Sequence, residues 1–202
     1  MQTSYVGKLV KSNSHTDYIC QVYGPSEIEA PPTSVDHAFG TFVRIPLDAT
    51  DNDLIGLIYD TQLFNPEFGN LGPRLSPAPD LAVFSPDYLA EKVTLVGITA
   101  LGTLAPDGTA THGVPPVAAQ IDAMVERMDE EAVRRFHRAP GGGVRLGYVP
   151  LLLALGSPLA RHLVLHVIDR LSTLFPDQVA YLSVLRGELA WQAAIGPLGG
   201  GR

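Results

Sequence analysis

The chain contains Phe39-Gly40-Thr41-Phe42-Val43-Arg44-Ile45 and, after an acidic turn at residues 48–53, Leu54-Ile55-Gly56-Leu57-Ile58-Tyr59-Asp60. Both segments are short and rich in β-branched and aromatic residues, which is typical of β-strands. Pro46 predicts the end of the first strand, and Gly56 predicts a bend or bulge in the second. Because such bends are common where a sheet curls closed, the two segments favour a β-barrel.

Strand patterns continue on either side of this central pair. Residues 5–10 and 17–23 alternate apolar with small or polar residues, and residues 93–102 form a further apolar strand. Residues 61–90 are rich in proline and glycine, and they predict a long ordered loop with one short helical turn near its end. We therefore expect an antiparallel β-barrel in residues 1–111.

The pattern changes at His112-Gly113-Val114-Pro115-Pro116, since glycine and two prolines resist both a β-ladder and a helix interior. We place a domain boundary here, followed by a helical region over residues 112–202. Apolar spacing, N-caps and prolines at first helical positions predict helices over residues 121–128, 130–138, 158–174 and 177–194. The predicted fold class is α+β, with the barrel first and four or five helices after it.

The composition bounds the function. Apolar residues make up 46% of the 202 residues and charged residues 17%, so the chain can bury a core and could leave apolar surface for a partner. The alternative is that loops with many of the 20 glycines and 17 prolines dilute the charge. The net charge is −7, and residues 1–117 hold five basic against thirteen acidic side chains, which makes this half a poor nucleic-acid binder.

Cysteine usage and hydropathy bear on location. The single cysteine, Cys20, excludes an internal disulfide and a thiolate metal cluster, and its strand context indicates a buried apolar residue. The N-terminus has no signal pattern, and the longest apolar run, residues 149–155, is too short to span a membrane. We expect a cytoplasmic protein without membrane contact.

The strand and glycine pattern of the first half resembles the HAS-barrel, the small β-barrel at the N-termini of HerA-type DNA translocases and ATP-synthase ring subunits. The likeness rests on Val6-Gly7-Lys8-Leu9-Val10, the two central segments and Val96-Gly97-Ile98, and it covers residues 1–104. The whole chain is similar to stand-alone bacterial proteins that have this barrel followed by helices.

The resemblance implies a role in assembly. In ring ATPases the barrel packs against its neighbours and binds no nucleotide, and a P-loop follows it. This chain has no G-x-x-x-x-G-K-[ST] motif: Gly7-Lys8 lies in a strand, and Gly141-Gly142-Gly143-Val144-Arg145 lacks the lysine and the hydroxyl. We therefore expect no cofactor, and self-association or docking with a ring ATPase.

The strongest metal candidates are His162 and His166, which lie four residues apart on a predicted helix, with Asp169 near the same face. Leu163 occupies the position of the glutamate in H-E-x-x-H, so the alternative is two polar residues on an amphipathic helix. Two further histidines have structural interpretations. His112 is a candidate pocket residue or a satisfied loop histidine, and His137 is expected as an imidazolium at a helix C-terminus.

Other candidates concern partners. Trp191, Arg186 and Phe42 are interface candidates, and Trp191, the only tryptophan, could equally anchor the core. Arg127, Arg134, Arg135 and Arg138 could form a basic patch for nucleic acid or a solvated helix face.

These observations favour a non-enzymatic assembly or adaptor protein that forms a homo-oligomer or docks with a HerA-like ring ATPase. Two alternatives stay open. One is a nucleic-acid-handling accessory protein that uses the arginine patch, and the other is a metal-dependent enzyme that uses His162 and His166.

Overall fold

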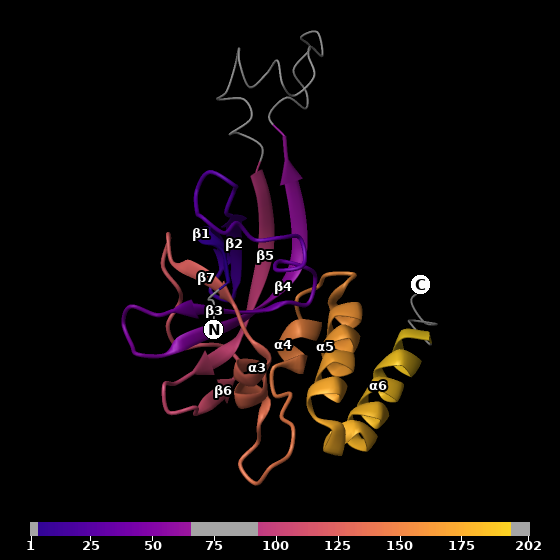
Figure 1. Cartoon of the computed structure of the whole chain (residues 1–202). Helices are drawn as coiled ribbons and strands as arrows, with labels where there is room; N and C mark the ends of the chain where they lie inside the picture. The colour runs from indigo at the N-terminus through magenta and orange to yellow at the C-terminus, as the bar shows by residue number, and fades with distance from the viewer. Residues whose placement is uncertain (1–3, 66–92, 195–202) are drawn as a thin grey trace.

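The computed structural model describes residues 4–65 and 93–194. The described chain forms strands first and ends in helices, which confirms the predicted α+β class (Figure 1). Its seven strands belong to one sheet: β1 Tyr5–Ser14, β2 Asp17–Val22, β3 Phe42–Pro46, β4 Asp53–Phe64, β5 Val93–Leu104, β6 Ala110–His112 and β7 Met124–Arg127.

The sheet closes into an antiparallel barrel. The strand order is β2-β1-β7-β3-β4-β5-β6, and an additional pairing of β2 with β5 joins six strands into a ring, with β6 outside it. Alternate side chains point inward and form an apolar core that includes Val6, Leu9, Ile45, Ile58 and Val125. Closure therefore removes the free strand edges that an open sheet would expose.

Glycines allow the barrel to bend. The register between β4 and β5 shifts between Ile55 and Gly56, which confirms the predicted bulge, and β3 ends at Pro46 as expected. Gly102 on β5 has φ +151°, and a Cβ there would lie 1.9 Å from the carbonyl oxygen of Thr111. The pairing of β5 with β6 therefore requires glycine at this position.

Strand β7 corrects two expectations. Residues 121–128 were expected as a helix, but Met124–Arg127 is a strand that pairs with both β1 and β3. Val125 is buried inside the barrel while Met124 is 46% exposed, which is the alternation of a strand. The apolar spacing of this segment fits either a helix or a strand. The segment is a strand because it fills the gap between β1 and β3 and pairs with both. The boundary expected after residue 111 therefore falls before the last barrel strand.

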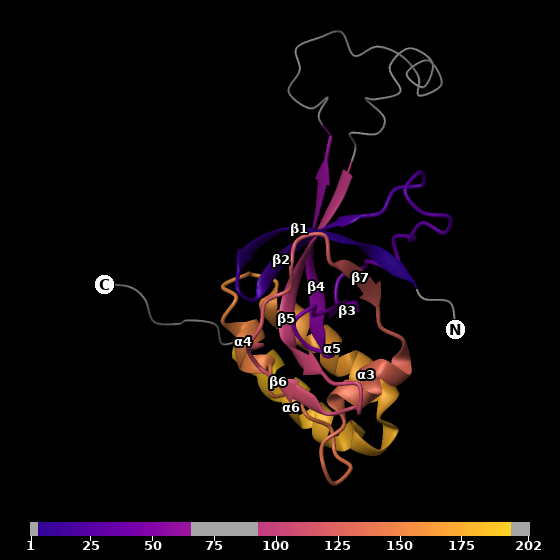
Figure 2. The ribbon, with the colours of Figure 1, turned by 90° about the vertical axis from the view of Figure 1, so that its left-hand side faces the viewer.

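The predicted loop at residues 61–90 begins later than expected, because β4 continues to Phe64. Strands β4 and β5 extend beyond the rest of the barrel in both views (Figures 1 and 2). The remainder of the predicted loop, with its short helical turn, lies outside the described residues.

The helices pack on one side of the barrel (Figure 2). They are α3 Glu130–His137, α4 Val149–Leu153, α5 Ala160–Leu174, a 3-10 turn η1 Pro176–Gln178 and α6 Val179–Ala194. Asp129 caps α3 as predicted, since its carboxylate accepts a hydrogen bond of 2.7 Å from the Ala132 amide. No described helix is long and apolar enough to cross a membrane.

A second apolar cluster joins the barrel to the helices. The barrel contributes Phe42, Ile55 and Leu57, and α5 contributes Val164 and Leu171, all of them fully buried. The outer face of β3 and β4 therefore packs against α5, and α6 packs outside α5 (Figure 1).

Candidate functional site

The predicted metal ligands lie on α5 without a third ligand among the described residues. His162 and His166 are both exposed, and the Asp169 carboxylate accepts a hydrogen bond of 2.7 Å from Arg186 Nε. No group of three or more His, Cys, Asp and Glu side chains comes together in residues 4–65 and 93–194. His166 instead packs on the barrel, where a Cβ at Gly40 would lie 2.2 Å from the His166 ring.

Phe42 is fully buried, which corrects the expectation that it contributes to an interface. Its ring meets the edge of His137 at a centroid distance of 5.1 Å, and the Arg170 guanidinium lies 5.3 Å from its centre. Burial lowers the pKa of Arg170, and this cation–π contact offsets part of the desolvation. Phe42 is therefore a core residue under α5.

The four arginines predicted as a patch separate into two groups. Arg127 pairs with Asp36 at 2.6 Å, and Arg134 pairs with Glu130 at 3.2 Å. The side chains of Arg135 and Arg138 have neither an ion pair nor a hydrogen bond within the described part of the chain, and both line a pocket. Half of the predicted patch is therefore neutralised by carboxylates of the same chain.

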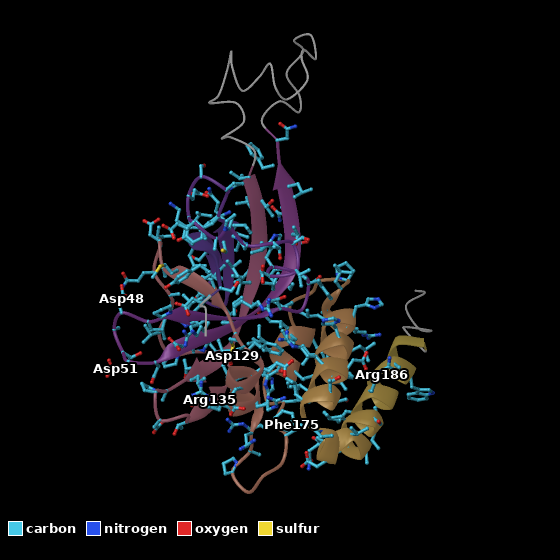
Figure 3. The ribbon with its side chains drawn as sticks, viewed as in Figure 1. Asp48, Asp51, Asp129, Arg135, Phe175 and Arg186 are labelled. Carbon is cyan, nitrogen blue, oxygen red and sulfur yellow. The ribbon has the colours of Figure 1, made fainter. Side chains whose placement is uncertain are left out.

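Arg186 and Trp191 lie on α6 in different environments. Arg186 connects α6 to Asp169 on α5, and because both side chains are about half exposed, solvent screens the pair and it adds little to stability (Figure 3). Trp191 is 65% exposed, so it does not anchor the core of the described chain. Of the two, only Trp191 offers a large apolar surface to a partner.

The exposed face of α6 has a regular pattern. Ala180, Val184, Gly187 and Trp191 are spaced four, three and four residues apart, and all four are exposed; we name them the α6 seam. This spacing is the a/d repeat of a coiled coil. The opposite face packs against α5 through Leu182, Leu185 and Leu189. The spacing can be recognised in the sequence, but the predicted interface candidates were Trp191, Arg186 and Phe42, of which only Trp191 belongs to the seam.

No close contact within the described chain requires glycine at position 187. A Cβ built there would meet nothing within 4 Å, although glycine in a helix interior costs about 1 kcal/mol relative to alanine. Val184 next to it is 62% exposed. The α6 seam thus combines two large apolar side chains with two small residues.

Two histidines lie in the second apolar cluster, each with its protonation defined by its partners. His112 Nε2 donates to the Phe136 carbonyl at 2.9 Å, and His112 Nδ1 accepts from the Gly147 amide at 3.1 Å. His137 Nδ1 donates to the Val133 carbonyl at 2.7 Å, and His137 Nε2 accepts from the Tyr148 hydroxyl at 2.7 Å. Each ring has one donor and one acceptor, which is the neutral form.

Burial keeps both rings uncharged. Desolvation lowers the pKa of His112 to about 4 and that of His137 to about 3, and the nearby Arg145 lowers both further. The expected imidazolium at position 137 is therefore wrong, because the side chain turns into the core instead of toward the helix end. His112 is a satisfied structural histidine.

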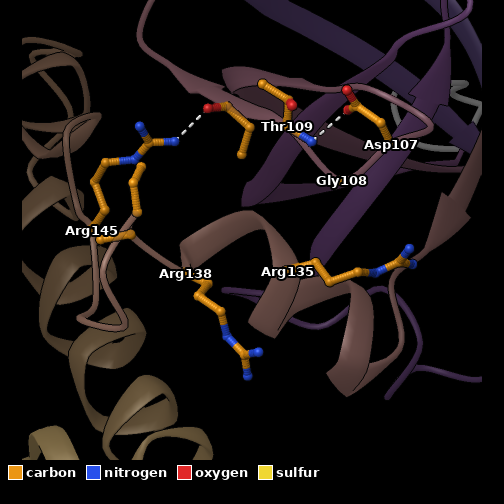
Figure 4. A pocket seen from close by; sticks show the side chains of 9 residues that line it. Asp107, Gly108, Thr109, Arg135, Arg138 and Arg145 are labelled. Atoms are coloured by element: carbon orange, nitrogen blue, oxygen red, sulfur yellow. Dashed lines mark hydrogen bonds between the residues drawn. The ribbon is translucent and has the colours of Figure 1, made fainter.

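The pocket lined by Arg135 and Arg138 has a volume of about 400 Å³. The turn between β5 and β6 forms one wall, and the end of α3 with the segment after it forms the other (Figure 4). Its lining residues are Asp107, Gly108, Thr109, Ala110, Arg135, Arg138, Ala139, Pro140 and Arg145. In the sequence, Arg145 was considered only in the rejected phosphate-loop segment and was not grouped with Arg135 and Arg138, because the two walls are far apart in the chain.

Comparison with known proteins assigns a family. A search of the curated proteins found no match to this sequence. One family model matches residues 1–197, nearly the whole chain, and is described as a domain of unknown function, DUF8166. The chain therefore belongs to the DUF8166 family.

Proposed function

We propose that this protein is a non-enzymatic assembly module whose chains associate in pairs through the α6 seam. The observation that carries the proposal is the exposed heptad spacing of Ala180, Val184, Gly187 and Trp191. An amphipathic helix that displays a second apolar stripe is typical of helix–helix association. The other face of α6 is already occupied by α5.

The seam is self-complementary when a second α6 runs antiparallel. In the register that places Val184 opposite Gly187 of the second copy, Trp191 lies opposite Ala180. Each large side chain then meets a small one, twice over, as a two-fold axis requires. The four seam residues carry no charge, so the centre of the paired surface would contain no ion. This fit supports a second copy of the chain as the partner that covers the α6 seam.

Three residues that could act as a nucleophile or a general base, His112, His137 and Cys20, do not support catalysis. His112 and His137 use both ring nitrogens within the fold, and Cys20 is buried with its thiol pKa raised to about 12. A nucleophile or general base needs a reactive protonation state near neutral pH, and none of these groups has one.

We further infer that the barrel is of the HAS type, which the closed six-stranded antiparallel sheet supports. In that case a ring ATPase of the HerA kind is a natural partner. Because closure hides most strand edges, the α6 seam is a better docking surface than the barrel wall.

Light scattering coupled to size-exclusion chromatography tests the proposal. We expect twice the mass of one chain. Because both copies lose a tryptophan and truncating each hot-spot tryptophan costs about 2 kcal/mol, Trp191→Ala should weaken dimerisation by about 1,000-fold. Val35→Ala, which removes exposed apolar surface elsewhere, is the matched control and should leave the dimer intact. A monomer at every concentration contradicts the proposal.

A further inference from the structure

We propose that the pocket between the β5–β6 turn and the end of α3 binds a small anion that carries two or more phosphate groups. Its volume of about 400 Å³ lies within the range of small-molecule sites, about 300–1,000 Å³. Three arginines and one aspartate line it, in a chain whose net charge is −7. Cations are thus concentrated here against the overall acidity of the molecule.

Two of the three arginines are available to a ligand. Arg135 and Arg138 are exposed and have no ion pair within residues 4–65 and 93–194, whereas Arg44, Arg127 and Arg134 are all paired with carboxylates. An arginine left without a carboxylate next to two others is repelled by them. An anion in the pocket relieves that repulsion.

Arg145 is the fixed member of the site. One of its terminal amino groups donates to the Ala110 carbonyl, which ties the two walls together, and its Nε is buried without a hydrogen-bond partner in the described chain. Its backbone is held as well, since the Arg145 amide donates to the His137 carbonyl at 2.8 Å. The guanidinium is therefore held in place before a ligand arrives.

Asp107 does not cancel this charge. Its carboxylate accepts a hydrogen bond of 2.8 Å from the Thr109 amide, which holds the β5–β6 turn and lowers the pKa of Asp107. No ion pair joins Asp107 to any of the three arginines among the described contacts. One carboxylate against three guanidinium groups leaves a net positive pocket.

The arrangement favours an anion with separated phosphates. In Figure 4 the Arg145 side chain extends toward the Thr109 turn, while Arg135 and Arg138 point in other directions. Side chains that diverge in this way suit separate phosphate groups of one short chain better than a single compact anion, and guanidinium binds phosphate through paired hydrogen bonds. A long polyanion is disfavoured because the rest of the chain is acidic.

Isothermal titration of the purified protein with inorganic pyrophosphate tests this site. We expect one saturable site that weakens as salt is added, and at least about tenfold weaker binding for the double variant Arg135→Gln/Arg138→Gln. Lys11→Gln removes an exposed cation on β1 and is the matched control, which should bind as the wild type does. Absence of saturable binding at low salt overturns the proposal, as does unchanged binding by the double variant.

Two further measurements distinguish a small anion from nucleic acid and the pocket from the dimer. A single-stranded oligonucleotide that binds and is not displaced by excess pyrophosphate would overturn the small-anion assignment in favour of nucleic acid. The Trp191→Ala variant should bind pyrophosphate normally, because the pocket contains no residue of α6. Failure of the pocket and failure of the dimer are therefore distinguishable.

Discussion

His112 and His137 show how the hydrogen bonds of single side chains stabilise this fold. Each imidazole satisfies one carbonyl and accepts one hydrogen bond, so a polar ring is buried without an unpaired atom. The cost is that neither ring can take up a proton without losing its acceptor role. Stability at the junction of barrel and helices therefore depends on their staying neutral.

Mild acid should destabilise the protein. The folded pKa values of His112 and His137 are lowered to about 4 and about 3 from 6.5, so below pH 6.5 the unfolded chain binds more protons than the folded chain. The contribution of these rings is complete above pH 6.5 and is lost as the pH falls through the folded pKa values, about 4 for His112 and about 3 for His137. The fully buried His137 accounts for up to about 1.4 kcal/mol per pH unit, and the partly exposed His112 accounts for less. Urea unfolding at a series of pH values measures this. His162→Gln should show the same decline, and a pH-independent unfolding free energy would contradict the prediction.

Removing the Tyr148 hydroxyl should leave His137 Nε2 as a buried acceptor without a donor. Tyr148→Phe is therefore expected to lower the free energy of unfolding by about 1–3 kcal/mol, although it deletes a single atom. Tyr181→Phe makes the same change at an exposed ring and should shift stability by less than about 0.5 kcal/mol. Equal effects of the two variants would refute the role of this hydrogen bond.

At the scale of elements, most local signals in the sequence were reliable, and the non-local ones were not. One local signal was wrong: Ser157-Pro158 predicted a helix from residue 158, but α5 begins at Ala160 without a side-chain cap. Pro46, Gly56 and Asp129 act on their own neighbours, and each does what its chemistry predicts. Strand β7 depends on the gap between β1 and β3, which no local pattern reveals. The arginine pocket likewise needs two distant segments to meet, so its residues were only half identified.

Gly187→Ala should act in opposite directions on the helix and on the dimer. Alanine favours helix by about 1 kcal/mol over glycine, and the added Cβ meets nothing within one chain, so the dissociated monomer should be more stable. In the antiparallel pair the same methyl would stand against Val184 of the second copy, so dimerisation should weaken. Thermal unfolding at protein concentrations below the dimer dissociation constant measures the stability of the monomer, and sedimentation at higher concentrations measures dimerisation. A variant that dimerises more tightly would contradict the register.

At the scale of the whole molecule, two separate apolar clusters stabilise the fold. One fills the barrel, and the other joins its outer wall to α3, α4, α5 and α6. Phe42 and Ile58 come from neighbouring strands, but the first faces the helices and the second the barrel interior. The wall formed by β3, β4 and β5 is therefore apolar on both faces, and the helices cover its outer face.

Barrel and helices should consequently unfold together. Calorimetry of the full chain is expected to give a single transition whose calorimetric and van't Hoff enthalpies agree. Leu171→Ala on α5 should lower the whole transition, since it opens a cavity against the barrel wall at a cost of about 2–5 kcal/mol. Two resolved transitions would show that the clusters are independent.

The pocket and the α6 seam have no residue in common, so dimerisation would leave both pockets free to bind. A pair of chains joined at α6 would present its two basic pockets simultaneously, as a bivalent receptor. Any larger assembly that displays the same anionic group repeatedly would then be held at two points, with an effective local concentration that a lone chain cannot reach.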